Sequence, residues 1–140
     1  MKNQVISFAV LLALGTIFTL TSCKKDEEET TVVTPTPTAL ITINEIEEGH
    51  TYEMDDTVHI DIDITADFEM HGYEAWLINE TAGDTVWSAD LHDHGTSFHI
   101  HDHWVNNVAD HSDMKLKVSA EIDHDGNTTV KEVHFHCHPM

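Results

Sequence analysis

Residues 58–65 read Val-His-Ile-Asp-Ile-Asp-Ile-Thr, which is the clearest signal of fold class in the chain. Apolar and polar side chains alternate in it without a break, which predicts a β-strand with one buried face and one polar face. A second alternating stretch covers 114–122, and shorter strand signals lie at 40–43, 72–79, 85–89, 97–105 and 131–137. No long stretch of 39–140 has the apolar spacing of an amphipathic helix. The sequence therefore predicts an all-β domain.

These strand signals are separated by turn residues, such as Thr-Ala-Gly-Asp at 81–84 and Asp-Gly-Asn at 125–127. About seven short strands in roughly a hundred residues are typical of an immunoglobulin-like antiparallel β-sandwich. A small jelly roll or barrel is the alternative architecture. Within the sandwich we expect an aromatic core formed by Trp76, Trp87, Trp104 and Phe98.

The charge balance excludes two classes of partner. The chain has 140 residues, with 26 acidic residues, six lysines and no arginine, and its net charge is −20 with neutral histidine. A nucleic-acid binder needs a basic stripe to neutralise phosphates, and binding to an anionic membrane surface through charge needs basic segments. The strongly acidic composition therefore excludes both kinds of partner. Thirteen histidines instead lie between His50 and His138. This composition indicates divalent cations or a response to pH.

The first residues have the pattern of a bacterial lipoprotein leader. Lys2 is followed by the apolar stretch 5–20 and then by Leu-Thr-Ser-Cys at 20–23. The apolar stretch is short for a membrane span and ends in small residues, which is typical of a signal peptide. Small residues before Cys23 resemble a lipobox, so we expect residues 1–22 to be removed and Cys23 to be lipidated. An uncleaved anchor with an incidental cysteine is the alternative.

Residues 23–38 read as a tether between the lipid and a folded domain at 39–140. Thr and Pro alternate before residue 39, and such sequences favour an extended linker. Lys-Lys-Asp-Glu-Glu-Glu at 24–29 resembles the export signal of Bacteroidota lipoproteins displayed on the outer face of the outer membrane. We therefore expect an outer-membrane lipoprotein exposed on the cell surface, or otherwise one that faces the periplasm.

The strongest functional signal is repeated His-x-His. Residues i and i+2 of a strand point to the same face, about 7 Å apart, so adjacent imidazoles can converge on one ion when another strand or loop adds a ligand. Imidazole suits Zn, Cu and Ni, and neighbouring carboxylates neutralise the cation. Zn or Cu is the ion we expect first, with Ni next and Ca less favoured. Three such clusters occur, namely His92/His94, His99/His101/His103 and His134/His136/His138.

The expected topology groups these candidates. The second and fifth predicted strands are neighbours in such sandwiches, so their outward residues should form one patch: His59, Asp61, Asp63, His99, His101 and His103. The seventh strand should present His134, His136 and His138 on the outer face of the other sheet. One end of the sandwich should gather His71, His92, His94 and His124, and the other end His50, His103, His111 and His138. The first of these ends, or the fifth-strand patch, is the predicted metal site.

Each of these patterns also has a structural interpretation. His-x-His and Asp61-x-Asp63 can be solvated faces of strands. Asp-His-Asp-Gly-Asn at 123–127 looks like the start of a calcium loop, but the later glutamate is missing, so we interpret it as a hairpin turn. His-Phe-His-Cys-His-Pro-Met at 134–140 looks superficially like copper-oxidase ligand runs, although its ligands are too crowded for a blue-copper site.

The cysteine count leaves Cys137 without a partner if Cys23 carries lipid, because the chain has only two cysteines. An unpaired thiol in an oxidising compartment is either buried or bound to something. Cys137 is therefore either a buried side chain or an additional metal ligand.

The whole layout resembles small His-rich Bacteroidota lipoproteins of unknown function, including the DUF4625 family. The matching features are Cys23, Glu-Glu-Gly-His at 47–50, the His-rich middle and the turn at 123–127, and together they span most of the chain. The resemblance implies a lipidated protein with one immunoglobulin-like domain. It implies no activity, since that family has no established one.

Two functions follow from these features. The first is a cell-envelope lipoprotein that binds Zn, Cu or Ni through its His-x-His clusters, for capture, buffering or transfer. The alternative is a surface adhesion or protein-interaction module, which would have a metal-independent partner. We do not expect an enzyme, because the sequence has no P-loop, no dinucleotide-binding turn and no nucleophile elbow.

Overall fold

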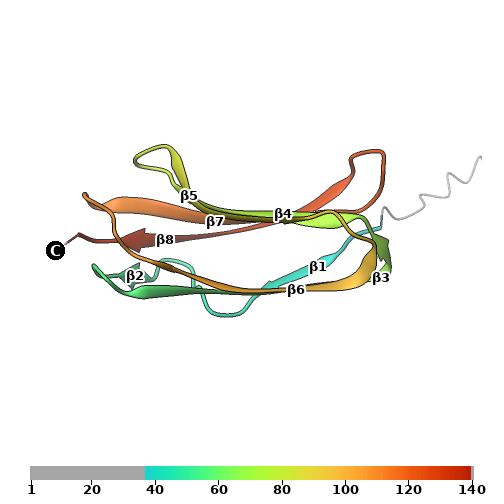
Figure 1. The fold of residues 1–140 in the computed structure, drawn as a ribbon, viewed down its shortest axis with the longest axis horizontal. Helices are drawn as coiled ribbons and strands as arrows, with labels where there is room; N and C mark the ends of the chain where they lie inside the picture. The colour runs from blue at the N-terminus through green and yellow to red at the C-terminus, as the bar shows by residue number, and fades with distance from the viewer. Residues whose placement is uncertain (1–36, 140) are drawn as a thin grey trace, which may run out of the picture. The chain divides into compact units, whose positions relative to one another are not determined.

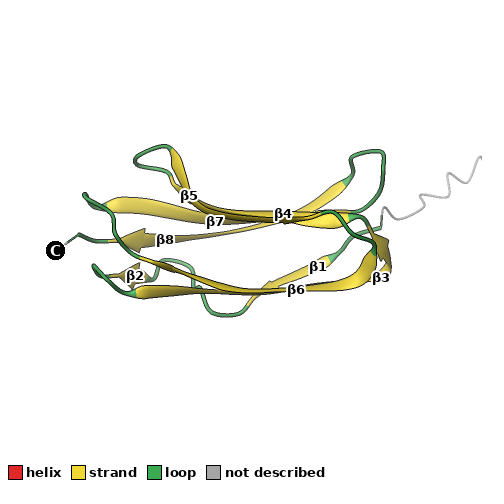
Figure 2. Ribbon diagram, in the orientation of Figure 1, coloured by secondary structure: helices red, strands yellow, loops and turns green. Residues whose placement is uncertain are grey.

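The computed structural model of the protein describes residues 37–139. The predicted leader 1–22, the lipidation site Cys23 and the tether up to residue 36 lie outside the described residues, as does Met140. Between 37 and 139 the chain has only strands, turns and loops (Figure 2). No helix in this part is long and apolar enough to cross a membrane. The eight strands are β1 (Leu40–Ile43), β2 (Thr51–Tyr52), β3 (Thr57–Met70), β4 (Gly72–Asn79), β5 (Asp84–Leu91), β6 (Gly95–Val105), β7 (Ser112–Glu121) and β8 (Thr128–Cys137).

The strands form two sheets that face each other, which confirms the predicted immunoglobulin-like sandwich (Figure 1). One sheet has the order β1-β3-β6 and the other has the order β2-β8-β7-β4-β5. All pairs are antiparallel except β2 with β8, where Thr51 lies opposite His136 and Tyr52 opposite Cys137. Strand β2 was not predicted, because two residues after a turn are too short to show alternation.

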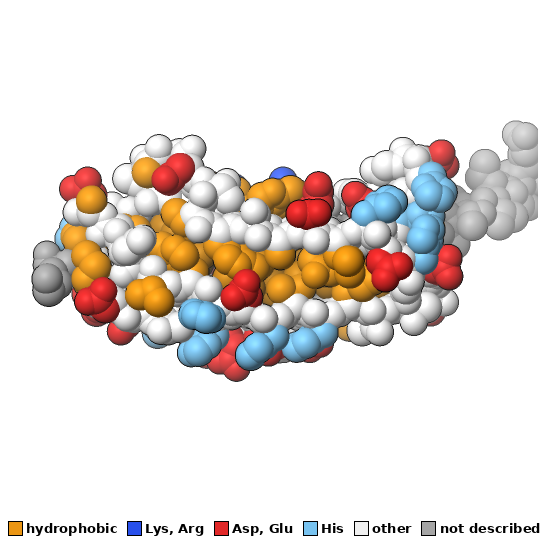
Figure 3. All heavy atoms as spheres, in the orientation of Figure 1, with side chains coloured by type: hydrophobic (Ala, Val, Ile, Leu, Met, Phe, Trp, Pro, Cys, Tyr) orange, Lys and Arg blue, Asp and Glu red, His pale blue; other side chains and the backbone are white. Residues whose placement is uncertain are grey.

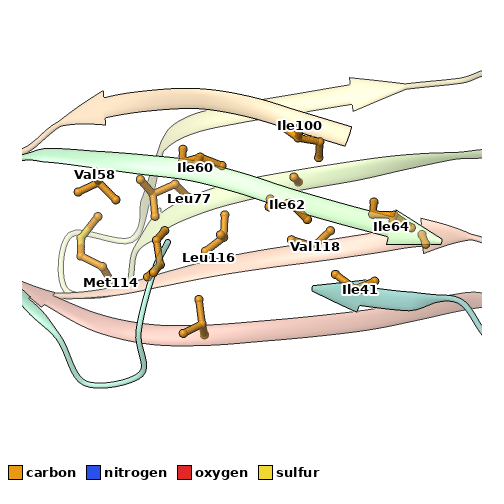
Figure 4. Close-up of a cluster of buried hydrophobic side chains, with 14 of the residues drawn as sticks. Ile41, Val58, Ile60, Ile62, Ile64, Leu77, Ile100, Met114, Leu116 and Val118 are labelled. Atoms are coloured by element: carbon orange, nitrogen blue, oxygen red, sulfur yellow. The ribbon is translucent and has the colours of Figure 1, made fainter. Parts of the chain in front are cut away.

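The core lies between the sheets and comes from the alternating stretches (Figure 4). The inward residues of β7 and of the first half of β3 are buried, whereas most of their polar neighbours point outward. Apolar side chains that leave water in this way supply the main stabilisation of a domain of this size. The labelled core residues are Ile41, Val58, Ile60, Ile62, Ile64, Leu77, Ile100, Met114, Leu116 and Val118.

The prediction that Trp76 is a core residue is wrong. Its neighbours Ala75 and Leu77 are buried and face the core, so Trp76 is half-buried on the outer face of β4. There the ammonium of Lys117 lies 5.7 Å from the centre of its ring, in cation–π range. Trp87, Trp104 and Phe98 are partly buried and do pack against the core, as predicted.

Candidate metal centre

Three connections between strands lie at one end of the sandwich. Two of them, β3–β4 and β5–β6, lead from one sheet to the other, and the third is the β7–β8 hairpin. Strand β3 belongs to the three-stranded sheet and β4 to the five-stranded sheet, and His71 is the single residue between them. Its backbone N–H donates a hydrogen bond of 2.9 Å to the carbonyl oxygen of Glu121 at the end of β7. The chain therefore changes sheets at His71, and this crossing fixes its position beside β7.

Gly72 makes that sharp crossing possible. Its φ is +138°, a conformation that side chains with a Cβ rarely adopt. A Cβ at this position would collide with the carbonyl oxygen of Leu91 and would lie 3.1 Å from the Cα of His92. Only glycine lets β4 approach the end of β5 so closely, and this approach brings His71 near the β5–β6 loop.

The other two segments complete this end. Residues 92–94 carry the chain from β5 back to β6 in the three-stranded sheet, and residues 122–127 connect β7 to β8. In the second segment the Asp123 carboxylate accepts hydrogen bonds from the backbone N–H groups of Asp125 (2.9 Å) and Asn127 (3.2 Å) and from the Asn127 side chain (2.7 Å). The Asp123 carboxylate thus caps a hairpin turn, as predicted, and the turn presents His124.

Three imidazoles converge here, namely those of His71, His94 and His124, which we call the end cluster. The ring centre of His71 lies 3.8 Å from that of His124 and 4.5 Å from that of His94. One potential ligand atom from each ring lies within 4.8 Å of the others. Figure 3 shows histidine side chains gathered at this end of the molecule. His92, the fourth histidine predicted here, is 75% exposed, and its Nδ1 lies 3.6 Å from Glu121 instead.

The ring of His71 has a lowered pKa and a buried nitrogen atom without a hydrogen-bond partner in the part of the chain that the structure describes. Its Nδ1 atom is buried and has no hydrogen-bond partner among the described residues. Burial, followed by the neighbouring imidazoles of His124 and His94, lowers the pKa of His71 below the ordinary value of 6.5. The ring is therefore neutral at pH 7, and a neutral imidazole has a free lone pair for a metal ion.

The donor set of the end cluster fits a transition-metal ion. Zinc is held by imidazole nitrogens at roughly 2.0–2.1 Å, so two ligands of a tetrahedral site lie roughly 3.3 Å apart. In the present structure the three potential ligand atoms lie within 4.8 Å of one another, which is near this spacing. The Nδ1 of His94 lies 3.3 Å from a carboxylate oxygen of Glu69, which orients the ring and leaves Nε2 for an ion.

We expect nuclear magnetic resonance to give a pKa below 6.5 for His71 in the folded, metal-free chain. In the unfolded chain His71 loses this burial and takes up its proton at the ordinary value. The unfolded state therefore binds more protons here as the pH falls through 6.5, and the contribution of His71 to stability declines. A titration of the ring in the native chain and in urea measures the difference. A native value at or above the urea value would contradict this environment.

The second predicted site, on the outer face of the three-stranded sheet, is present as a patch. Strands β3 and β6 pair as expected, and Asp61 lies opposite His101 and Asp63 opposite His99. The Nδ1 of His99 lies 3.0 Å from Asp63 Oδ1, and that of His101 lies 3.1 Å from Asp61 Oδ2. Asp61, His99 and His101 form a second group of three converging potential ligands. His59 and His103 lie opposite each other further along the strands and do not join this group.

Asn44 organises the two carboxylates. Its backbone N–H donates to the Asp61 carbonyl oxygen (2.9 Å), which extends the pairing of β1 beyond Ile43. Its side-chain N–H groups donate to Asp61 Oδ1 (2.6 Å) and to Asp63 Oδ2 (3.0 Å). These bonds, followed by those from His101 and His99, lower the pKa values of Asp61 and Asp63. Nothing in the sequence pattern indicated Asn44, because its role depends on where β1 lies against β3.

The third predicted cluster does not converge. His134 and His136 are exposed on the outer face of β8 and His138 lies partly exposed just beyond it, but each Nδ1 lies near a different carboxylate. His134 is 3.3 Å from Glu80, His136 is 2.9 Å from Asp113 and His138 is 3.7 Å from Glu53. Of the histidines predicted at the other end of the sandwich, His111 contacts His138, and His50 contacts Tyr52. Beyond the end cluster and the Asp61 group, residues 37–139 contain no further group of three converging ligands.

Cys137 is buried in the core, while His136 and His138 beside it lie near the surface. Burial, and then the charge of Asp56, raises the pKa of the thiol to about 12. Since the thiolate is the form that binds metals, the structure favours the buried interpretation of Cys137 over the ligand one.

Comparison with known proteins adds no family. No protein-family model matches the chain, and no curated protein sequence is similar to it.

Proposed function

We propose that this protein binds a divalent transition-metal ion, Zn(II) or Cu(II) first, at the end cluster of His71, His94 and His124. The observation that carries the proposal is the convergence of three imidazoles from three separate connections, with a buried His71 nitrogen that has no partner in the described structure. On a solvated polar face the imidazole nitrogens would contact water, whereas the Nδ1 atom of His71 is buried. An unpaired polar atom in such a place costs about 1–3 kcal/mol, and a bound ion would offset this cost.

The role that we propose is binding rather than catalysis, at the surface of a cell envelope. Lipid on Cys23 and the tether 23–38 would hold the domain at the outer membrane, in keeping with the resemblance to Bacteroidota lipoproteins. The net charge of −20 would concentrate cations near the domain. Three imidazoles leave at least one coordination position open, which suits capture and transfer of the ion.

Calorimetric titration of the full chain at pH 7.5 tests the proposal, with Zn(II), Cu(II), Ni(II) and Ca(II) as ligands. We expect a micromolar or tighter site for Zn(II) or Cu(II), and no binding of Ca(II) at this cluster because Ca(II) prefers oxygen ligands. His94→Ala should weaken the tightest site by at least about 100-fold. Loss of a residue that only hydrogen-bonds to a metal ligand already lowers metal affinity by about 10–100-fold, and His94 would be a ligand itself.

His92→Ala is the matched control, since it removes an imidazole from the same loop but outside the cluster. It should leave the tightest site unchanged. The absence of any micromolar site, or equal losses in His92→Ala and His94→Ala, would overturn the proposal.

A further inference from the structure

The outer face of the three-stranded sheet carries a second cluster, separate from the end cluster. Its members come from the middle of β3 and β6 and from Asn44 after β1. Figure 3 shows histidine and acidic side chains side by side along the β6 side of the molecule. The donor set differs from that of the end cluster, because carboxylates lie beside the imidazoles.

The two imidazoles of this face are aligned with each other. The rings of His99 and His101 are stacked, with centres 6.2 Å apart and planes 11° from parallel. Both rings lean across to β3, where each Nδ1 contacts a carboxylate oxygen within 3.1 Å. The potential ligand atoms of Asp61, His99 and His101 all lie within 4.8 Å of one another, and ligands on one zinc ion lie roughly 3.3 Å apart.

The contacts resemble the surroundings of a metal ligand more than those of a solvated strand face. A carboxylate that accepts the Nδ1 proton of a histidine fixes the neutral tautomer and leaves a lone pair on Nε2. Asp63 does this for His99. Asn44 in turn donates to both carboxylates, so Asp61 and Asp63 are themselves held in place.

Charge and exposure define which ion would bind. The carboxylates of Asp61 and Asp63 place negative charge beside the two imidazoles, which favours a divalent cation. Mixed nitrogen and oxygen ligands suit Zn(II) and neighbouring transition metals, whereas Ca(II) and Mg(II) take oxygen ligands. The side chains of His99 and His101 are 56% and 70% exposed, so water has access to the remaining coordination positions.

We propose that Asp61, His99 and His101, supported by Asp63 and Asn44, form a second, solvent-exposed site for a divalent transition-metal ion. The site is independent of the end cluster. We expect it to bind Zn(II) more weakly than the end cluster does, because it has no counterpart of the buried, unpartnered Nδ1 of His71. The domain would then hold two zinc ions, one at its end and one on its face.

Equilibrium dialysis of Zn(II) against the full chain at pH 7.5 tests this site. His99→Gln/His101→Gln should reduce the bound zinc by one ion per chain, and His71→Ala/His124→Ala should remove a different single ion. His59→Gln/His103→Gln is the matched control, because it removes two imidazoles from the same face and the same two strands but outside the site. It should bind as much zinc as the unaltered chain.

Asp61→Asn provides a second variant with minimal change of shape. It should weaken the second zinc ion by at least about 10-fold. In the His71→Ala/His124→Ala chain, added Zn(II) should shift the ring resonances of His99 and His101 before those of His59 and His103.

Unchanged zinc content in His99→Gln/His101→Gln, or equal losses in the control pair, would overturn the second site and leave the end cluster standing. If the His71→Ala/His124→Ala chain kept its full zinc content while His99→Gln/His101→Gln alone lost one ion, the proposed function would fail and the second site would stand.

Discussion

We expect Zn(II) to raise the melting temperature of the full chain and His124→Ala to remove most of that rise. An ion at 100 times its dissociation constant stabilises the folded state by about 2.7 kcal/mol, which is on the order of 10 °C for a domain of this size. Loss of one of three imidazoles should weaken binding about 100-fold or more, which leaves about 0.4 kcal/mol at the same zinc concentration. Thermal unfolding of metal-free chains with and without Zn(II) measures both values.

The zinc effect should also depend on pH. Protons compete with the ion for the imidazoles, so the rise should shrink between pH 7.5 and pH 5.5. His92→Ala should retain the rise at pH 7.5, because His92 lies outside the end cluster and contacts Glu121. A zinc-induced rise that is equal in His92→Ala and His124→Ala would contradict the assignment of the site.

Gly72→Ala should destabilise the fold by about 2–6 kcal/mol. A positive φ costs a residue with a Cβ about 1–3 kcal/mol, and forced overpacking adds about 1–3 kcal/mol. The added methyl group would collide with the Leu91 carbonyl oxygen, so the end of β5 must move. This movement separates His71 from the loop that carries His94, and we expect zinc binding to weaken at the same time. Urea unfolding and zinc titration measure the two effects.

Gly83→Ala is a control that measures the cost of backbone strain without a steric collision. Gly83 also has a positive φ, +78°, but a Cβ there would meet nothing within 4 Å. It should therefore cost only the strain of about 1–3 kcal/mol and leave zinc binding unchanged. If Gly72→Ala cost no more than Gly83→Ala, the close approach of β4 to β5 would not be needed for the end cluster.

Strand positions and faces were predictable from the sequence where alternation is strict. In β3 and β7 every second residue is apolar, so burial of one face also places Asp61 and Asp63 on the outer face. In β4 both faces carry apolar residues, and alternation alone could not place Trp76. The predicted pairing of the second and fifth strands depended on the fold class, and the β3–β6 register confirms it.

Side-chain alternation and composition are local properties, so a two-sheet domain rich in histidine and carboxylate side chains was predictable from the chain alone. The expected topology also placed His71, His92, His94 and His124 at one end. The packing of the folded chain brings His71, His94 and His124 together and leaves His92 near Glu121. It likewise decided that the three histidines of the last strand each contact a separate carboxylate. Ligand convergence depends on differences of a few ångströms between segments far apart in the chain, and sheet crossings such as the one at Gly72 set those distances.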